Sequence, residues 1–467
     1  MLKRLLAFII GIVIIASGMQ VLAAGPVFDL TAEAAILVEQ TTGRQLYGKN
    51  EHKRMYPASM TKILTALVAL DYLEPDEFII LGEELRETPA NSSIAYLEPG
   101  ETILMEHLLR GLLIMSGNEA GCAIAYNTAK RIKGVADIDY DEAEKLFSDL
   151  MNIKAAELGA LDTHFTNPHG FHDENHYSTA YDIALFSRAF LEVPLLAKIV
   201  AETTFTGNSA GDEPPEGALT LEHSWLTHNK LIMDSEEGYY TYANGIKTGF
   251  TDEAGNCIAA SAEKDGVKLI SVVFFSPEPG VWVDSKTMME YGFNNYSFFD
   301  VQKSNELLEQ AVIGRPRLGE PALLDVLSKG SFRDFYSKEE IRRIKRKIVY
   351  DESFLDKPDN DVTLGAAVLK PPIMKGDVLG KVSYYLDGQV IYTDDAIAAA
   401  DTYKRTLGSD LNYYLNLVKK NLFNKSAVPY WIGGAAILAA FIIILTVRHR
   451  KRKRNQRFSM YRRRRWN

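Results

Sequence analysis

The sequence of 467 residues has little cysteine, only Cys122 and Cys257, which excludes a disulfide framework and any zinc site made of four cysteines. It also lacks a fixed-period repeat and a low-complexity linker. With 46% hydrophobic and 24% charged residues, the chain has the composition of a folded protein with more than one core. Each cysteine lies in an apolar run, so we expect two buried free thiols, although an exported protein could also pair them.

Positive charge is concentrated at the two ends of the chain. The net charge is -9, yet residues 25–429 hold 39 Lys and Arg against 61 Asp and Glu, a balance of -22. This acidic body disfavours nucleic acid as a partner. The last 20 residues carry eleven Lys or Arg and no acid. Such a tail could bind nucleic acid, but a basic run that follows a membrane span more often sets topology and contacts anionic lipid.

Residues 1–23 have the pattern of a secretory signal peptide. Lys3 and Arg4 precede an apolar run at 5–16, and cleavage after Ala23 would put Val21 and Ala23 at the two positions that require small residues. No cysteine follows that could carry a lipid. An uncleaved anchor is the alternative. In both cases the body of the protein is expected to be exported.

Residues 427–447 form an uncharged stretch that is long enough to cross a bilayer. Tyr430 and Trp431 lie at its start, where aromatic residues favour the membrane interface, and Arg448 follows it. The positive-inside rule then puts the basic tail, 448–467, in the cytoplasm and the preceding residues on the outer face of the cytoplasmic membrane.

Hydrophobic periodicity divides the exported part into two domains. In the first, 28–297, a hairpin at 34–49 precedes helical periodicity over about 61–192, and strands return at 242–275. From 298 to 400, short apolar runs alternate with turn signals, which is typical of a small β-rich domain.

Residues 401–426 are expected to contain an amphipathic helix that forms a juxtamembrane stalk. Leu411, Leu415 and Val418 fall on one helical face, with Lys419 and Lys420 beside it. Packing of this helix on the β domain is the alternative.

The first chemical motif is Ser59-x-x-Lys62. Residues three apart on a helix share a face, so the Lys62 ammonium can reach the Ser59 hydroxyl. Pro57 suits the first turn of such a helix, and residues 63–70 are apolar nearly all round, as in a buried helix. The nucleophile would then lie at a helix N-terminus, where exposed N–H groups and the helix dipole favour an alkoxide and an oxyanion.

Two further motifs follow, Ser116-x-Asn118 after a helical stripe and Lys247-Thr-Gly on a predicted strand. Each alone is weak evidence. All three, in this order and at these separations, resemble the motifs of the penicillin-recognising serine enzymes, a superfamily that includes β-lactamases and peptidoglycan D,D-peptidases.

The closer resemblance is to the D-alanyl-D-alanine carboxypeptidases of the low-molecular-mass penicillin-binding protein type. It also rests on residues 34–39, 167–170 and 177–182, and it covers about residues 28–293. The fold it implies is an α/β (α+β) serine β-lactamase-like domain, an antiparallel sheet with a helical subdomain. A small β domain and a C-terminal transmembrane helix follow. One departure is the anchor, a full span here but a surface-lying amphipathic helix in several members.

The resemblance implies a serine-type carboxypeptidase that removes the terminal D-alanine from peptidoglycan stem pentapeptides during cell-wall maturation. Its partners would be a stem peptide ending in D-Ala-D-Ala, β-lactam antibiotics as covalent inhibitors and cytoplasmic membrane lipid. No cofactor is expected.

Roles for the catalytic residues follow from the chemistry this reaction needs. Ser59 would attack the carbonyl of the penultimate D-alanine, and Lys62 would take its proton, which requires a lysine that is at least transiently neutral. Ser116 would pass the proton to the leaving D-alanine. Asn118 would hold the substrate amide and Lys62, and it could also cap the following helix.

Substrate binding is assigned to the third motif and the residue after it. Lys247 and Thr248 would bind the terminal carboxylate, and Lys247 would help to keep Lys62 neutral. Gly249 would let the strand backbone approach the substrate. By resemblance, the backbone N–H groups of Ser59 and Phe250 form the oxyanion hole.

A group of histidines and acids suggests a metal site, comprising His164, His169, His172, Asp173, Glu174 and His176. However, the His-Glu-x-x-His helix of zinc hydrolases is absent, and Pro168 and Gly170 break any helix there. We therefore expect no catalytic metal and expect His169 to order a loop.

Two other functions share these motifs. A β-lactamase needs a residue that drives rapid deacylation, for which Glu174 is the only candidate in the His-rich loop. A non-hydrolytic penicillin-binding wall receptor would keep Ser59 and Lys62 but bind rather than hydrolyse.

Overall fold

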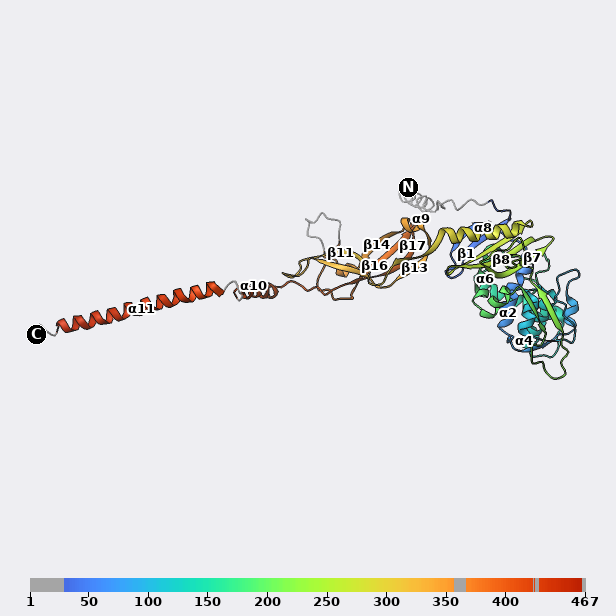
Figure 1. The fold of residues 1–467 in the computed structure, drawn as a ribbon, viewed down its shortest axis with the longest axis horizontal. Coiled ribbons are helices and arrows are strands. Elements are labelled where there is room, and N and C mark those ends of the chain that lie inside the picture. The colour runs from blue at the N-terminus through green and yellow to red at the C-terminus, as the bar shows by residue number, and fades with distance from the viewer. Residues whose placement is uncertain (1–28, 357–366, 423, 425–427, 464–467) are drawn as a thin grey trace, which may run out of the picture. The chain divides into compact units, whose positions relative to one another are not determined.

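The structure is a computed structural model that describes residues 29–356, 367–422, 424 and 428–463 (Figure 1). The predicted signal peptide, 1–23, lies outside these described residues. The chain divides into two compact units. The first runs up to Phe299 and also includes Asp334–Lys338, and the second contains Asp300–Arg333 and the chain from Glu339 onward.

The first unit is built on an antiparallel five-stranded sheet with the strand order β2-β1-β9-β8-β7. Its strands are β1 Ala34–Glu39, β2 Gln45–Lys49, β7 Ala243–Thr251, β8 Gly255–Lys264 and β9 Val267–Ser276. The predicted N-terminal hairpin is β1 and β2, and the predicted late strands are β7 to β9. Because β1 pairs with β9, the sheet joins the beginning of the domain to its end, and β7 lies at one edge.

The chain between β2 and β7 is mainly helical. Its helices are η1 Ala58–Thr61, α2 Lys62–Leu70, η2 Glu83–Glu87, α3 Met105–Leu113, α4 Asn118–Lys133, α5 Tyr140–Glu157, α6 Ala180–Leu191 and α7 Pro194–Ala201. Two short strands interrupt these helices, β3 Phe78–Ile80 and β4 Thr102–Leu104, and two more follow α7, β5 Thr204–Asn208 and β6 Glu222–Leu226. Helix α8, Gly280–Asn295, follows β9. The helical periodicity predicted over 61–192 is therefore broken by the β3–β4 pair.

Both faces of the main sheet are covered. On one face Ile36 and Val272 belong to a core that includes the fully buried Ile63 and Leu64 of α2. On the other face residues such as Leu37 pack in a second core with α8. Burial on both faces explains why β1 is an unbroken apolar run rather than an alternating one. It also fixes the start of α2 against the sheet, where the first motif lies.

The second unit contains a six-stranded sheet with the order β14-β16-β17-β12-β11-β15. Its strands are β11 Leu307–Ile313, β12 Leu323–Ser328, β14 Lys345–Tyr350, β15 Val368–Leu369, β16 Val378–Leu386 and β17 Gln389–Ala398. Strands β10, Tyr296–Gln302, and β13, Phe332–Ser337, form a separate pair, and the short helices are α9 Lys338–Arg343 and η3 Glu352–Phe354. The predicted fold class, including the small β domain, is confirmed.

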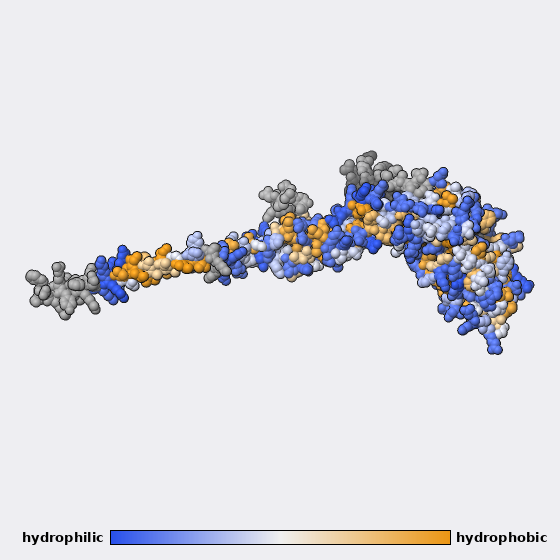
Figure 2. All heavy atoms as spheres, in the orientation of Figure 1, coloured by the Kyte–Doolittle hydropathy of each residue, from blue (hydrophilic) through white to orange (hydrophobic). Residues whose placement is uncertain are grey.

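Two helices follow the β domain. Helix α10, Leu407–Leu422, exposes its apolar residues Leu411, Leu415 and Val418. Helix α11, Val428–Arg463, includes a segment long and apolar enough to cross a membrane, with a mean hydropathy of 2.3. Figure 2 shows this apolar band in orange, followed by blue basic residues.

Candidate active site

The first motif forms the centre of the site. Ser59 lies in η1, a turn of 3-10 helix that leads directly into α2, so the α-helix itself begins at Lys62 and not before Ser59. Lys62 Nζ donates a hydrogen bond to Ser59 Oγ over 2.9 Å. Ala58, immediately before the serine, has φ of 46°, a left-handed conformation that alanine adopts at a cost. The tight turn thereby presents the half-buried serine while its lysine partner stays inside.

Lys62 is completely buried and uses all three donors of its ammonium group. Besides Ser59, Nζ donates to Asn118 Oδ1 over 2.6 Å and to the backbone carbonyl of His169 over 2.7 Å. Burial, and next the positive charge of Lys247, hold the Lys62 pKa well below its ordinary value. The three acceptors favour the charged form and burial disfavours it, so burial makes a proton easier to remove from this lysine.

The second motif lies between α3 and α4. Ser116 has φ of 60° and lines the same cavity as Ser59. Asn118 is the first residue of α4, and its backbone N–H donates to the Ser93 carbonyl over 2.8 Å. The prediction that Asn118 might cap this helix is wrong, because the N-cap is Gly117 and no side chain caps it. The amide side chain is thus left for Lys62 and the cavity.

The third motif lies on edge strand β7. Lys247 is buried, Nζ donates to the Thr248 carbonyl over 3.0 Å, and burial lowers the pKa of Lys247 to about 7. Gly249 faces the nucleophile's own backbone, because a Cβ at this position would lie 3.0 Å from the Pro57 carbonyl oxygen and 3.1 Å from Ser59 N. The missing side chain at Gly249 permits this close approach of η1 to β7, and the expected approach of the strand backbone to the substrate stays a prediction.

These elements enclose a cavity of about 700 Å³. Six of the predicted site residues line it, namely Ser59, Ser116, Asn118, Thr248, Gly249 and Phe250. Lys62 and Lys247 are buried behind this wall. The segments 90–93 and 170–172 supply other parts of the lining, whereas Glu174 is exposed and does not line the cavity.

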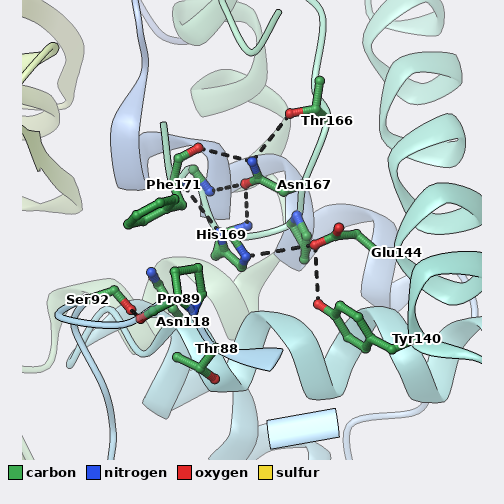
Figure 3. A network of polar contacts seen from close by, with 12 residues as sticks. Thr88, Pro89, Ser92, Asn118, Tyr140, Glu144, Thr166, Asn167, His169 and Phe171 are labelled. Carbon is green, nitrogen blue, oxygen red and sulfur yellow. Dashed lines mark hydrogen bonds and ion pairs between the residues drawn. The ribbon is translucent and has the colours of Figure 1, made fainter. Parts of the chain in front are cut away.

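The loop that follows α5 supplies the third acceptor for Lys62, the His169 carbonyl. Figure 3 shows Asn167, His169 and Phe171 of this loop. Asn167 folds this loop: its Oδ1 accepts from Gly170 N over 2.7 Å, and its Nδ2 donates to the Phe171 carbonyl over 3.0 Å. Gly170 has φ of 83°, and a Cβ there would lie 1.9 Å from the Ala58 carbonyl oxygen. The loop is therefore fitted tightly against the turn that carries the nucleophile.

The histidines of this region have separate partners. The His169 ring contacts Glu144 at 3.9 Å, and burial, followed by the Lys62 charge, holds the His169 pKa well below its ordinary value. His176 Nε2 lies 2.8 Å from Thr61 Oγ1. His169 Nδ1 accepts a hydrogen bond from Phe171 N over 3.2 Å, which supports its expected role in ordering the loop, while its carbonyl binds Lys62.

Behind His169, Glu144 accepts a hydrogen bond from the Tyr140 hydroxyl over 3.3 Å (Figure 3). Burial raises the pKa of Glu144 and of Tyr140. Both cysteines are buried free thiols, as predicted, and burial raises the pKa of Cys122 and of Cys257 to about 12. Neither thiol is therefore a nucleophile at neutral pH.

Sequence reasoning missed Glu119, which follows Asn118 in α4. Its buried carboxylate accepts hydrogen bonds from Ala95 N over 2.5 Å and Leu97 N over 3.5 Å, and burial raises its pKa. These bonds hold Ala95 and Leu97 against α4. The two residues come just after the cavity-lining segment 90–93. The sequence signal for this residue was an acidic side chain directly after the Ser116-x-Asn118 motif, on a helix face that is otherwise buried.

The fold and this serine–lysine arrangement define a penicillin-binding-protein-like serine hydrolase. Residues 19–277 match the family described as D-alanyl-D-alanine carboxypeptidase, and residues 333–405 match the penicillin-binding protein 5 C-terminal domain. The first match spans more than half of the chain. The chain belongs to the D-alanyl-D-alanine carboxypeptidase family, and the predicted resemblance is confirmed.

Curated relatives agree over most of the chain. The D-alanyl-D-alanine carboxypeptidase DacF of Bacillus subtilis is 30% identical over 381 residues, which cover 80% of this chain and 86% of the relative. DacA of Haemophilus influenzae is 29% identical over 414 residues, covering 85% and 91%. The crystal structure of penicillin binding protein 5 from H. influenzae matches with a TM-score of 0.56 and 26% identity, covering 81% of this chain and 99% of that one. The enzyme is a serine carboxypeptidase.

Proposed function

We propose that this enzyme removes the terminal D-alanine from peptidoglycan stem pentapeptides through an acyl-enzyme on Ser59, and so acts in cell-wall maturation. The observation that carries this proposal is the 2.9 Å contact between the Ser59 hydroxyl and a completely buried lysine. A lysine whose pKa is lowered by burial is available as a neutral base.

In the acylation step, Ser59 Oγ attacks the carbonyl carbon of the penultimate D-alanine while Lys62 Nζ takes the hydroxyl proton. The oxyanion that forms is stabilised by the backbone N–H groups of Ser59 and Phe250, a placement supported by the close approach of Gly249 to Ser59 N. As the peptide C–N bond breaks, the proton passes from Lys62 through the Ser116 hydroxyl to the leaving amine. Water then hydrolyses the ester, and Ser59 is regenerated.

Lys247 and Thr248 bind the terminal carboxylate of the substrate. Because burial lowers the pKa of Lys247 to about 7, the arriving carboxylate stabilises the charged ammonium, since an opposite charge raises a lysine pKa. Asn118 holds Lys62 and is free to bond the substrate amide. A β-lactam acylates the same serine and remains bound covalently.

For the whole chain we propose a signal peptide at 1–23, a catalytic domain at 28–297 and a β domain at 298–400. An amphipathic stalk at 401–426, a span at 427–447 and a basic cytoplasmic tail at 448–467 complete it. The enzyme is then exported and anchored to the outer face of the bacterial cytoplasmic membrane. The length and hydropathy of α11, with its following basic residues, support this topology.

The test combines intact-mass spectrometry with a D-alanine assay. Wild-type protein treated with benzylpenicillin is expected to gain one penicilloyl adduct and to release D-alanine from a pentapeptide, and Ser59→Ala is expected to do neither. A wild-type protein without an adduct contradicts the acyl-enzyme on Ser59. An adduct that clears within seconds indicates a β-lactamase, and a stable adduct without D-alanine release indicates a receptor.

A further inference from the structure

Strand β7 gives the substrate a direction, if the proposed function holds. Along β7, Thr248 is the residue that would bind the terminal carboxylate. Gly249 comes next and lies against Ser59, and Phe250 follows it. With its carboxylate and scissile carbonyl placed in that order, an extended peptide runs antiparallel to the edge strand β7. The acyl part of the peptide then extends past Phe250 towards the tip of the β7–β8 hairpin, at about 3.3 Å per residue.

The hairpin tip fixes a carboxylate at this end of the cavity. Thr251 pairs with Gly255, so the turn consists of three residues with Glu253 at its centre. Ala254 is buried, and its N–H donates to Thr251 Oγ1 over 3.1 Å, which holds the turn in place. Glu253 lines the cavity with its side chain 47% exposed.

A second segment faces this carboxylate. His172, from the loop after Gly170, places Nδ1 4.0 Å from Glu253 Oε2, and the Tyr56 ring packs edge-on against the imidazole at 4.6 Å. Phe171 and Phe250, both exposed to more than a third, also line the cavity. The acyl end thus combines aromatic surface with a negative group.

Glu253 differs from the other long carboxylate of the cavity. Glu278 is paired with Lys230 at 2.5 Å. Within the described residues, neither Glu253 nor its neighbour Asp252 has a Lys or Arg within ion-pair distance. Negative charge at the acyl end is therefore left for a cationic ligand, while the carboxylate-binding end carries Lys247.

We propose that Glu253 is a specificity residue that selects stem peptides in which the residue before the penultimate D-alanine carries a free ammonium on its side chain. The alkyl part of that side chain lies along Phe171 and Phe250, and the ammonium reaches the Glu253 carboxylate. A neutral or anionic group at that position forms no ion pair with Glu253. This proposal rests on the proposed function, because that function sets the direction of the peptide.

The test uses two peptides that end in Lys-D-Ala-D-Ala and differ only in a free or an acetylated Nε. For the wild type we expect kcat/KM for D-alanine release to be about two- to fivefold higher with the free amine, the size of effect that a half-exposed ion pair gives. Glu253→Gln is expected to bring this ratio close to one. The matched control Glu278→Gln, which removes the cavity-lining carboxylate that is paired with Lys230, is expected to keep the wild-type ratio. Raising the salt concentration should shrink that ratio.

A reversed-charge variant keeps the proposal testable whatever the effect on folding. Glu253→Lys is expected to favour a peptide whose Nε is succinylated, and its rate of acylation by benzylpenicillin reports whether the active site is intact. Equal wild-type rates with the free and acetylated peptides overturn the role of Glu253 and leave the proposed function standing. A Glu253→Gln enzyme that retains the preference also overturns it. Absence of D-alanine release from either peptide overturns the proposed function itself.

Discussion

The carbonyl oxygen of His169 accepts a hydrogen bond from Lys62 Nζ over 2.7 Å, although the two residues are 107 positions apart in the chain. This bond joins Lys62, the first residue of α2, to a loop that has no regular secondary structure. The loop is held by Asn167 and by the fit of Gly170 against Ala58. The position of Lys62 therefore depends on how this loop is folded.

Gly170→Ala is expected to destabilise the protein by at least about 1 kcal/mol and to slow acylation of Ser59 by penicillin, because alanine is strained at φ of 83° and its Cβ would collide with the Ala58 carbonyl. Thermal unfolding and the acylation rate measure the two effects. Gly134→Ala is the matched control, since Gly134 has φ of 67° with nothing within 4 Å of a Cβ. That variant should lose stability alone. Equal acylation rates in the two variants would contradict the proposed fit.

Asn167→Ala removes the side chain that accepts from Gly170 N and donates to the Phe171 carbonyl. We expect acylation to slow at least tenfold, because the loop that presents the His169 carbonyl to Lys62 is no longer held. Asn167→Asp keeps the acceptor and loses the donor, so its acylation rate should fall between those of the wild type and the alanine variant. Stopped-flow measurement with a chromogenic β-lactam checks this order.

The three motifs could be predicted to meet because each has its own sequence signature and each begins or lies on a regular element. The His169 carbonyl could not be predicted, since any residue supplies a backbone carbonyl and only the folded loop directs it. The start of α2 at Lys62 could not be predicted from the sequence either, because 3-10 and α-helical turns favour the same residues. The contact of Gly249 with η1 could not be predicted either, because it is a tertiary contact, and the approach of Gly249 to the substrate stays a prediction.

Glu119→Ala is expected to lower the free energy of unfolding by about 1–3 kcal/mol, because it leaves the Ala95 and Leu97 N–H groups buried without their acceptor. Glu119→Gln keeps an acceptor oxygen of the same shape, and burial, which raises the Glu119 pKa, disfavours the charge that this variant removes. The glutamine variant should therefore lie within about 1 kcal/mol of the wild type. Urea unfolding of both variants tests this, and equal losses would show that the charge, not the hydrogen bonding, matters.

The Lys247 pKa of about 7, lowered by burial, predicts a descending pH limb in the free enzyme. Below pH 7 the Lys247 ammonium is charged and binds the substrate carboxylate. Above pH 7 Lys247 of the free enzyme loses its proton, so kcat/KM for a D-Ala-D-Ala peptide should fall about tenfold per pH unit well above the pKa. Lys247→Arg retains its charge to far higher pH and should lose this limb, even if its activity is lower. A descending limb that persists unchanged in the arginine variant would assign the titration to another group, since arginine cannot deprotonate in this range.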